Sequence, residues 1–289
     1  MPPRRIEEFD VYEFHAVIAE EKGEYVAIGY DKTRLEIGNI RTSNLEDARA
    51  QIRHFLASKS DEFVGYEGAI NNFLRVYPGG FQDPFFLYDE RTYKQKAHEK
   101  ATALLSRDAL SACLETKDYS RIAEAARGVF INLIFPNEAM NFISFVRKDE
   151  NAKHFGPALY ELLYGEQFNR AFDDMSYLLA SGGVVKWTIL TYWPFILFPD
   201  RHMFLKPEVA QLSAHRLGED FGYESRPRSA VYDRFLDYVD RLRARISDLR
   251  PRDNIDVQTF MYVIGKSGFV REGVERRRTW LAKQSVSRA

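Results

Sequence analysis

The sequence predicts an α+β protein that is predominantly α-helical, with a small N-terminal antiparallel sheet followed by a multi-helix body. Short runs of β-branched and aromatic residues, separated by turn residues, fill residues 11–40 and indicate strands. From Asn44 onward, apolar residues recur at the spacing of amphipathic helices. The chain has 289 residues, of which 45% are apolar and 14% aromatic, and these are enough to form a large buried core.

The N-terminal strands are expected at VYEFHAVIAE, EYVAIGY and RLEIGNI, and the turn-like residues 21–24 separate the first two. A helix over residues 45–56 follows. Asn44 is a good N-cap for this helix, because its side chain can accept hydrogen bonds from the first free backbone N–H groups. Glu46 and Asp47 add negative charge to the first turn, where the helix dipole favours it.

The body is expected to contain successive amphipathic helices, and Pro207 and Gly218 suit the start and the end of one of them. The expected ranges are 69–77, 93–105, 121–135, 157–165, 166–180, 207–218, 232–249 and 257–265, followed by a polar tail. The Pro-Gly-Gly turn at residues 78–80 predicts a boundary between an N-terminal α/β region, 1–78, and a helical body with a basic C-terminal tail, 79–289. A single combined domain is the alternative.

Composition and motifs exclude several classes of protein. The formal net charge of −1 excludes a uniformly basic nucleic-acid coat, but it permits a basic face that acidic faces balance. The chain has one cysteine, Cys113, and therefore no internal disulfide. No apolar run is long enough to span a bilayer, so we expect a cytoplasmic protein with no membrane partner. His202 and His215 lack the short-spaced ligands of a zinc site, and nucleotide-binding motifs are absent, so we expect no metal and no cofactor.

The stretch from Leu179 to Gly218 places a Gly-Gly turn between two apolar helix patterns. Glycine allows a close approach of backbone to ligand, because it has no side chain in the way. The N–H groups of Gly182 and Gly183, together with the positive end of the following helix, could therefore grip a phosphate. Buried helix packing interrupted by a loop is the alternative.

Residues 179–188, LASGGVVKWT, are similar to the hairpin of the helix-hairpin-helix DNA glycosylases. Residues 199–203, PDRHM, are similar to the motif that carries the essential aspartate in that family. The resemblance covers about 40 of the 289 residues. The sequence departs from the family pattern, because the two glycines are adjacent and Ala180 replaces a proline. An alternative alignment, anchored on residues 214–218, puts Lys206 where the family's aspartate belongs.

The resemblance implies a base-excision site that needs no metal and no cofactor. Asp200 would activate an attacking water or lysine, and Lys186 would be the nucleophile if burial lowered its pKa. The implied DNA contacts are Gly182, Gly183, His202 and Lys206. The implied base pocket is formed by Trp187, Tyr192 and Trp193. Alternatively, WTILTYWPFILF is a core helix whose aromatic residues pack in the interior.

Two acidic residues, Asp253 and Asp256, lie between predicted helices. Either could cap the helix that follows. Alternatively, one of them is an acid in a cleft where Gln258 reads a base edge.

Two basic segments could contact phosphate. The tail carries Arg276, Arg277 and Arg278 beside Trp280, and this combination suits phosphate contact and base stacking, although basic tails also serve solubility alone. The polar run at residues 88–98 opens a helix and is either a solvated helix face or a positive rim. That rim would comprise Arg91, Lys94, Lys96 and His98.

Together these features favour a DNA glycosylase-like hydrolase that flips out and excises a damaged or modified base from DNA. Repair and antiviral defence against phage with modified DNA are both compatible with the residues. One alternative is a non-catalytic nucleic-acid-binding module that uses the same hairpin and tail. The other is a helical protein–protein interaction domain with an aromatic-rich surface.

Overall fold

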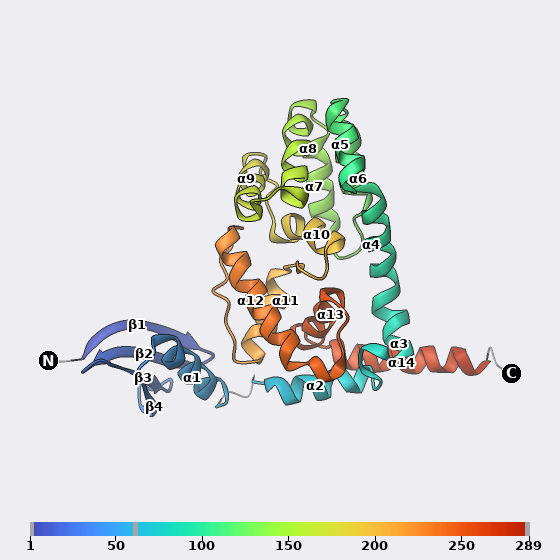
Figure 1. The fold of residues 1–289 in the computed structure, drawn as a ribbon. Coiled ribbons are helices and arrows are strands. Elements are labelled where there is room, and N and C mark those ends of the chain that lie inside the picture. Colours follow the sequence, from blue (N-terminus) through green and yellow to red (C-terminus); the bar gives the residue numbers. More distant parts are fainter. Residues whose placement is uncertain (1–2, 60–62, 287–289) are drawn as a thin grey trace.

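The computed structural model describes residues 3–59 and 63–286. It confirms an α+β protein that is predominantly helical, with an antiparallel sheet near the N-terminus and a helical body after it (Figure 1). The sheet lies to one side of the body, and the C-terminal helix extends from the opposite side. Within the described ranges, no helix is both long enough and apolar enough to cross a membrane.

The sheet is a meander in the order β1-β2-β3-β4, and neighbouring strands are antiparallel. The strands are β1 (Arg4–Val11), β2 (Phe14–Glu21), β3 (Glu24–Tyr30) and β4 (Glu36–Thr42). The prediction of one strand over residues 11–20 is wrong at its start. The chain turns at Tyr12, whose φ of 56° lies in the left-handed region, and Val11 pairs with Phe14 across this turn. The residues before the turn form β1, which the sequence analysis did not predict.

Helix α1 (Leu45–Ala57) covers one face of the sheet and closes a small core. The predicted cap is confirmed: the Asn44 side chain accepts hydrogen bonds from the backbone N–H groups of Glu46 and Asp47. The fit between helix and sheet is close. A Cβ atom at Gly29 would come within 2.5 Å of Cδ2 of Leu56, so this strand position has no room for a side chain.

A long series of helices builds the body. They are α2 (Gly65–Val76), α3 (Pro84–Phe86), α4 (Thr92–Leu104), α5 (Arg107–Glu115), α6 (Tyr119–Gly128), α7 (Pro136–Val146), α8 (Asp149–Tyr164), α9 (Phe168–Ser181), α10 (Trp187–Leu197), α11 (Pro207–Arg216), α12 (Ser229–Arg245), α13 (Asn254–Gly265) and α14 (Phe269–Val286). Between them lie the 3₁₀ turns η1 (Gly80–Gln82) and η3 (Ser247–Leu249), and the π-helical turn η2 (Leu87–Arg91), which joins α3 to α4.

The body has two lobes that share one continuous hydrophobic core (Figure 1). We call α5–α10 the upper lobe, and α2 with α11–α14 the lower lobe. The chain begins in the lower lobe, crosses to the upper lobe along α4, and returns after α10. The lower lobe is therefore built from two separate parts of the sequence, and its contacts with η2 and α4 join those parts.

The Pro-Gly-Gly turn at residues 78–80 is not the domain boundary that the sequence predicts. Tyr77 and Phe81, on either side of this turn, are both fully buried in the large core. The small core of the sheet and α1 is separate from it. Ala57 is the last buried residue of the small core, and Ala69 is the first of the large core. The turn is thus a bend inside the helical body.

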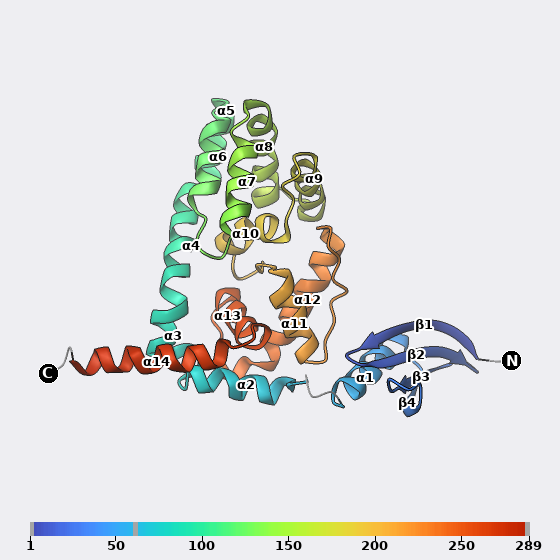
Figure 2. The same cartoon turned by 180° about the vertical axis from the view of Figure 1, so that it is seen from behind.

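Several segment predictions differ from the structure in their bounds or type. The predicted helix over 121–135 ends at Gly128, and an irregular turn follows before α7. The predicted polar tail is instead the helix α14, which runs beside α2 and then projects beyond the body (Figure 2). Gly273 permits this close packing, because a Cβ atom there would come within 2.7 Å of Cγ1 of Val76.

Helix α10 is the most apolar helix of the body, and all of its residues are buried. The predicted base pocket is therefore wrong, because Trp187, Tyr192 and Trp193 lie in the core. Each has its polar atom satisfied by a backbone carbonyl: Trp187 Nε1 donates to Glu224 at 2.8 Å, Tyr192 Oη to Val129 at 2.6 Å, and Trp193 Nε1 to Ala126 at 3.0 Å. These rings have the packing role that the alternative interpretation gave them.

Replacing Trp193 by alanine should destabilise the protein by about 3–5 kcal/mol, because it opens a cavity among Phe130, Phe142 and Phe155. Trp280→Ala is the matched control on the projecting helix, where the ring is only partly buried, and its effect should be clearly smaller. Guanidinium unfolding measures both. Equal losses for the two variants would contradict this description of the core.

Candidate functional site

The catalytic pair that the sequence predicts does not converge. Lys186 precedes the first residue of α10, and Asp200 lies in the turn after its last residue. The 11 residues of α10 place the ends of the helix about 16 Å apart. Both side chains are exposed. The prediction that Lys186 and Asp200 act on one sugar is therefore wrong.

The Gly-Gly turn is a helix cap. Gly183 has a φ of +69°, and its N–H donates to the carbonyl of Ala180 at 2.9 Å, while the N–H of Val184 donates to Leu179 at 2.9 Å. This is the Schellman pattern, in which glycine provides the left-handed residue after a helix. Gly182 faces Phe145 of α7 so closely that a Cβ atom would come within 2.2 Å of the ring. Since the Gly183 N–H is used by the cap, the predicted phosphate grip by both glycines is wrong.

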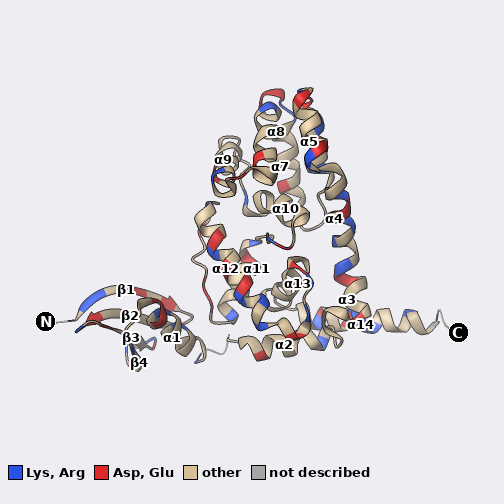
Figure 3. Cartoon of the chain, in the orientation of Figure 1, with Lys and Arg blue, Asp and Glu red and all other residues tan. Residues whose placement is uncertain are grey.

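All three predicted arginines of the tail form ion pairs within the protein, and two of them pair with residues outside α14. Arg276 binds Asp89 of η2 at 2.9 Å, and Arg277 binds Asp83 at 2.8 Å. These pairs fix α14 to the start of the α3–α4 run, so Arg276 and Arg277 have a structural role, and their contact with nucleic acid stays a prediction. Arg278 is exposed and lies 3.4 Å from Glu275. Acidic and basic residues are mixed along the outer helices (Figure 3).

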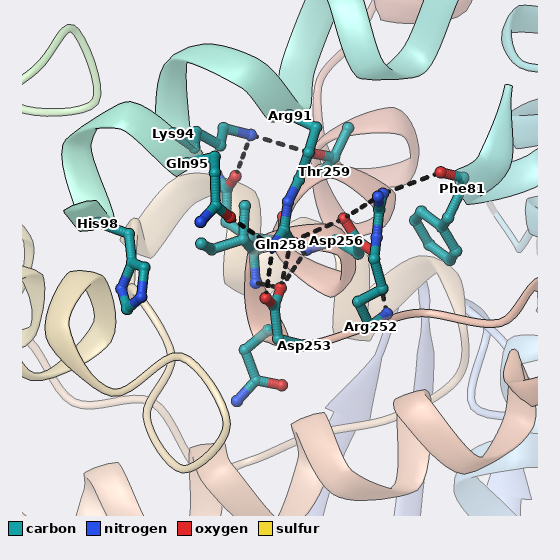
Figure 4. Close-up of polar contacts among 12 residues, drawn as sticks. Phe81, Arg91, Lys94, Gln95, His98, Arg252, Asp253, Asp256, Gln258 and Thr259 are labelled. Carbon is teal, nitrogen blue, oxygen red and sulfur yellow. Dashed lines mark hydrogen bonds and ion pairs between the residues drawn. The ribbon is translucent and has the colours of Figure 1, made fainter. Parts of the chain in front are cut away.

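The residues predicted at 253–258 lie in a buried ion-pair network between α4 and α13 (Figure 4). Asp253 caps α13, as the first of the two interpretations proposed, by accepting hydrogen bonds from the N–H groups of Ile255 and Asp256. Arg91 reaches Asp253 at 2.5 Å and Asp256 at 3.1 Å, and Arg252 reaches Asp256 at 2.8 Å. Because both carboxylates are held by guanidinium groups, they form a structural clamp.

Burial of these charges has a clear electrostatic consequence. Burial lowers the pKa of Arg91, but the hydrogen bond and charge of Asp253, together with Asp256, outweigh it and raise that pKa. Asp256 itself is 0% exposed. A fully buried carboxylate requires paired cations, since an unpaired buried charge costs several kcal/mol.

A second branch of the network surrounds Lys94, whose side chain is 1% exposed. Its Nζ atom donates to Glu90 at 2.8 Å, to Gln258 at 2.7 Å and to Thr259 at 2.9 Å. Neither prediction for the polar run at 88–98 holds for Lys94 and Arg91, because both point into the protein interior (Figure 4). His98 also points inward, and its Nδ1 atom lies 2.8 Å from the carbonyl of Ile196.

The π-helical turn η2 explains why so many polar residues of this helix find partners. Its extra residue per turn aims Asp89, Glu90 and Arg91 in different directions: toward α14, along α4 and toward α13. Turns of this kind are rare and often mark functional sites.

Three buried polar atoms near the lobe junction have no hydrogen-bond partner within the described part of the chain: His202 Nδ1, Asn254 Oδ1 and Gln258 Nε2. Asn254 Nδ2 donates to the carbonyl of His202 at 3.1 Å, so the turn after α10 is held against α13. His202 lies against Phe168, with ring centroids 4.5 Å apart. Burial, and to a lesser degree the charge of Arg201, lower the pKa of His202 to about 4. The predicted role of His202 in DNA contact has no support from this position.

Lys206 is the predicted site residue whose surroundings suit chemistry best. It precedes the first turn of α11 and is partly buried where α7 meets the lower lobe. Its Nζ atom lies 4.1 Å from the ring centroid of Phe135 and 5.4 Å from that of Tyr262. Phe135 is 48% exposed, so solvent and ligands can reach this side of the amine. Lys206 with Phe135, Glu138, Thr188 and Tyr262 forms what we call the Lys206 site.

Opposing effects act on the pKa of Lys206. Burial lowers its pKa and the charge of Lys266 acts in the same direction, whereas Glu138 and Glu208 oppose them. The net effect is a lowered pKa, which increases the neutral, nucleophilic fraction of the amine. A lysine of this kind, partly buried and flanked by aromatic rings, can attack an electrophilic carbon.

Helix α13 connects the Lys206 site to the ion-pair network. It presents Gln258 and Thr259 to Lys94, and one turn further it presents Tyr262 to Lys206. Burial and the charge of Glu90 raise the pKa of Tyr262, so its phenol stays neutral. Within residues 3–59 and 63–286, no cluster of three or more ligand side chains could hold a metal ion.

Three residues near Lys206 were not predicted from the sequence, because they come from segments remote from it in the chain: Phe135, Glu138 and Tyr262. The sequence holds one signal in the apolar segment VQTFMYVIG, residues 257–265. This helix has no polar face, yet it contains the polar residues Gln258 and Thr259, which need partners in the interior. A second was Pro136, which is typical of the first turn of a helix and places Glu138 in that turn.

Asp256→Asn should destabilise the protein by about 3–5 kcal/mol, because it leaves the guanidinium groups of Arg91 and Arg252 without their shared anion. Asp248→Asn, at an exposed position of η3, is the control and should change the free energy of unfolding by less than about 0.5 kcal/mol. Urea unfolding at neutral pH measures both. A loss below about 1 kcal/mol for Asp256→Asn would contradict a structural role for the clamp.

Stability should fall by about 2 kcal/mol between pH 7 and pH 5 because of His202 alone. The unfolded chain binds a proton at this residue below its ordinary pKa of 6.5, whereas the folded chain resists protonation until about pH 4. His202→Phe keeps a ring at this position and should flatten the dependence in this window. His154→Phe, at an exposed histidine, should leave it unchanged. An unaltered slope in His202→Phe would refute the assignment.

Comparisons of the chain with protein-family models, with curated proteins and with solved structures find no match. The Lys206 site and the ion-pair network therefore carry the functional proposal on their own geometry.

Proposed function

We propose that the protein is a DNA glycosylase-like enzyme whose reactive amine is Lys206, in place of Lys186 and Asp200. The observation that carries this proposal is the partly buried Lys206 amine, 4.1 Å from an exposed aromatic ring and with a lowered pKa. The alternative alignment puts Lys206 where the helix-hairpin-helix glycosylases have their catalytic aspartate and would abolish that family's mechanism, so the proposal rests on the surroundings of Lys206 and not on the alignment.

The chemistry is nucleophilic substitution at a sugar. The neutral Lys206 amine attacks C1′ of an extruded nucleotide, a C–N bond forms, and the bond from C1′ to the base nitrogen breaks. The leaving base takes a proton from the attacking nitrogen. Opening of the sugar ring then gives an imine, and water hydrolyses it to an abasic aldehyde and free lysine. Burial favours this step, since only the uncharged amine attacks.

The surroundings of Lys206 suit an extruded base. Phe135, next to the start of α7, is 48% exposed, and bases stack on such aromatic rings with about 1–3 kcal/mol per base. The same helix packs against the Gly182 turn through Phe145. A DNA strand that follows α7 would pass from the exposed Lys186 to the exposed Lys266.

A non-catalytic nucleic-acid-binding role is the second candidate. It is favoured by the separation of Lys186 from Asp200, since this separates the pair that the family resemblance implies for catalysis. Such a protein would bind DNA in a salt-sensitive way and form no covalent intermediate.

The enzyme proposal predicts a covalent adduct with DNA that contains one abasic site, whose sugar presents an aldehyde. Cyanoborohydride should reduce the imine and trap protein on the oligonucleotide, as seen by gel shift under denaturing conditions. Lys206→Gln should lower trapping at least about 100-fold, because it removes the nucleophile.

Lys186→Gln is the matched control. It removes an exposed lysine at the start of α10 and should retain trapping at saturating DNA, with at most weaker binding. Trapping by Lys206→Gln at the rate of the unsubstituted protein would exclude Lys206 as the reactive amine. Salt-sensitive binding without any adduct would favour the non-catalytic candidate.

A further inference from the structure

Helix α14 extends beyond the body of the protein (Figure 1). Around Gly273 it packs against α2. Further along, Trp280 is partly buried, and residues 281–285 are exposed, including Leu281 at 46%. Most helical stability in proteins comes from the packing of one face, so an unsupported helix end is only marginally stable in water. The far part of α14 therefore suits a surface that packs against another molecule.

A groove with a volume of about 490 Å³ runs along one side of α14. Residues spaced by three or four positions line it, and this spacing places them on the same side of the helix. On α14 they include Glu272, Glu275, Thr279 and Lys283. We call this side of the helix the groove face.

Aromatic side chains also line the groove. The ring centroids of Tyr88 and Trp280 lie 6.1 Å apart, and those of Phe85 and Trp280 lie 5.6 Å apart. Tyr88 is 63% exposed. Aromatic residues are enriched in protein–protein interfaces, where a polar rim surrounds an apolar centre. The groove combines these two features, because its rings lie beside the charged residues of the helix.

The charges of the groove face are complementary to those of the same face in a second copy. Glu275 lies four residues before Thr279, and Lys283 lies four residues after it. In two antiparallel copies related by a two-fold axis at Thr279, Glu275 of each copy lies at the level of Lys283 of the other. Glu272, one turn before Glu275, adds to this attraction. The favourable pairing therefore occurs twice in one contact.

The neighbouring arginines do not oppose such a contact. Arg276 and Arg277 form ion pairs with carboxylates outside α14, and these pairs compensate their charge. The Glu275 side chain is 70% exposed, so its ion pair with Arg278 at 3.4 Å is open to solvent and weak. Glu275 can thus turn toward a second molecule at little cost in free energy.

We propose that the groove face of α14 is a self-association surface that binds a second copy of this chain. The two helices pack antiparallel, with Thr279 at the two-fold axis and an ion pair between Glu275 and Lys283 on each side of it. None of these residues belongs to the Lys206 site, so the inference goes beyond the proposed function and does not rest on it.

Sedimentation equilibrium of the full chain tests the assembly. We expect a reversible dimer at protein concentrations up to about 100 µM. Glu275→Lys should raise the dissociation constant at least about fivefold, because it removes both ion pairs and places like charges opposite each other. Adding Lys283→Glu restores opposite charges and should return the constant to within about twofold of the unsubstituted protein. A monomer at every concentration, or a dimer that Glu275→Lys leaves unchanged, would overturn the proposal.

A disulfide measures the register of the two helices, in a protein that also carries Cys113→Ser. Packed helices have axes about 8–10 Å apart, so the Cα atoms of the two Thr279 residues should lie within the reach of a disulfide, about 4.4–6.8 Å. Thr279→Cys should therefore form covalent dimers on mild oxidation. Ser285→Cys is the matched control, because its two copies lie about 18 Å apart along the helices. Cross-linking of Ser285→Cys as fast as that of Thr279→Cys would contradict the antiparallel contact.

Discussion

The ion pairs around Asp256 are the constraint on which the rest of the body depends. Helix α13 is buried along nearly its whole length, yet it carries a carboxylate that is 0% exposed. This arrangement is stable only if Arg91 and Arg252 stay in place, because the buried Asp256 carboxylate would otherwise be a poorly compensated charge. The pairs therefore fix the position of α13 against the π-helical turn, and with it the place of Tyr262 beside Lys206.

The π-helical turn η2 directly precedes α4, the helix along which the chain crosses between the lobes. The chain leaves the lower lobe along α4 and returns after α10, so contacts between η2, α4 and α13 join parts of the sequence that are 162 residues apart. Buried Lys94 adds three hydrogen bonds to this junction. Directional polar contacts fix the geometry of such a junction more precisely than apolar packing alone. Lys206 lies at the edge of this junction, between the lobes.

Local signals in the sequence predicted much of the fold. Helical periodicity located most helices, Asn44 marked a cap that the structure contains, and Pro207 marked the start of α11. Local signals did not predict the site, because proximity in sequence is not proximity in space. Lys186 and Asp200 flank one helix and are held apart by it, whereas Lys206 obtains Phe135 and Tyr262 from segments that only the tertiary fold brings together. The glycine turn resembled a phosphate grip because helix caps and anion sites use the same residue type.

The most direct test of the central claim is to identify the residue that carries the sugar. The protein is incubated with abasic-site DNA and cyanoborohydride, the DNA is digested to the linked sugar, and tryptic peptides are sequenced by mass spectrometry. We expect the reduced sugar on the peptide that contains Lys206. Attachment at Lys186, at Lys266 or at many lysines equally would contradict it.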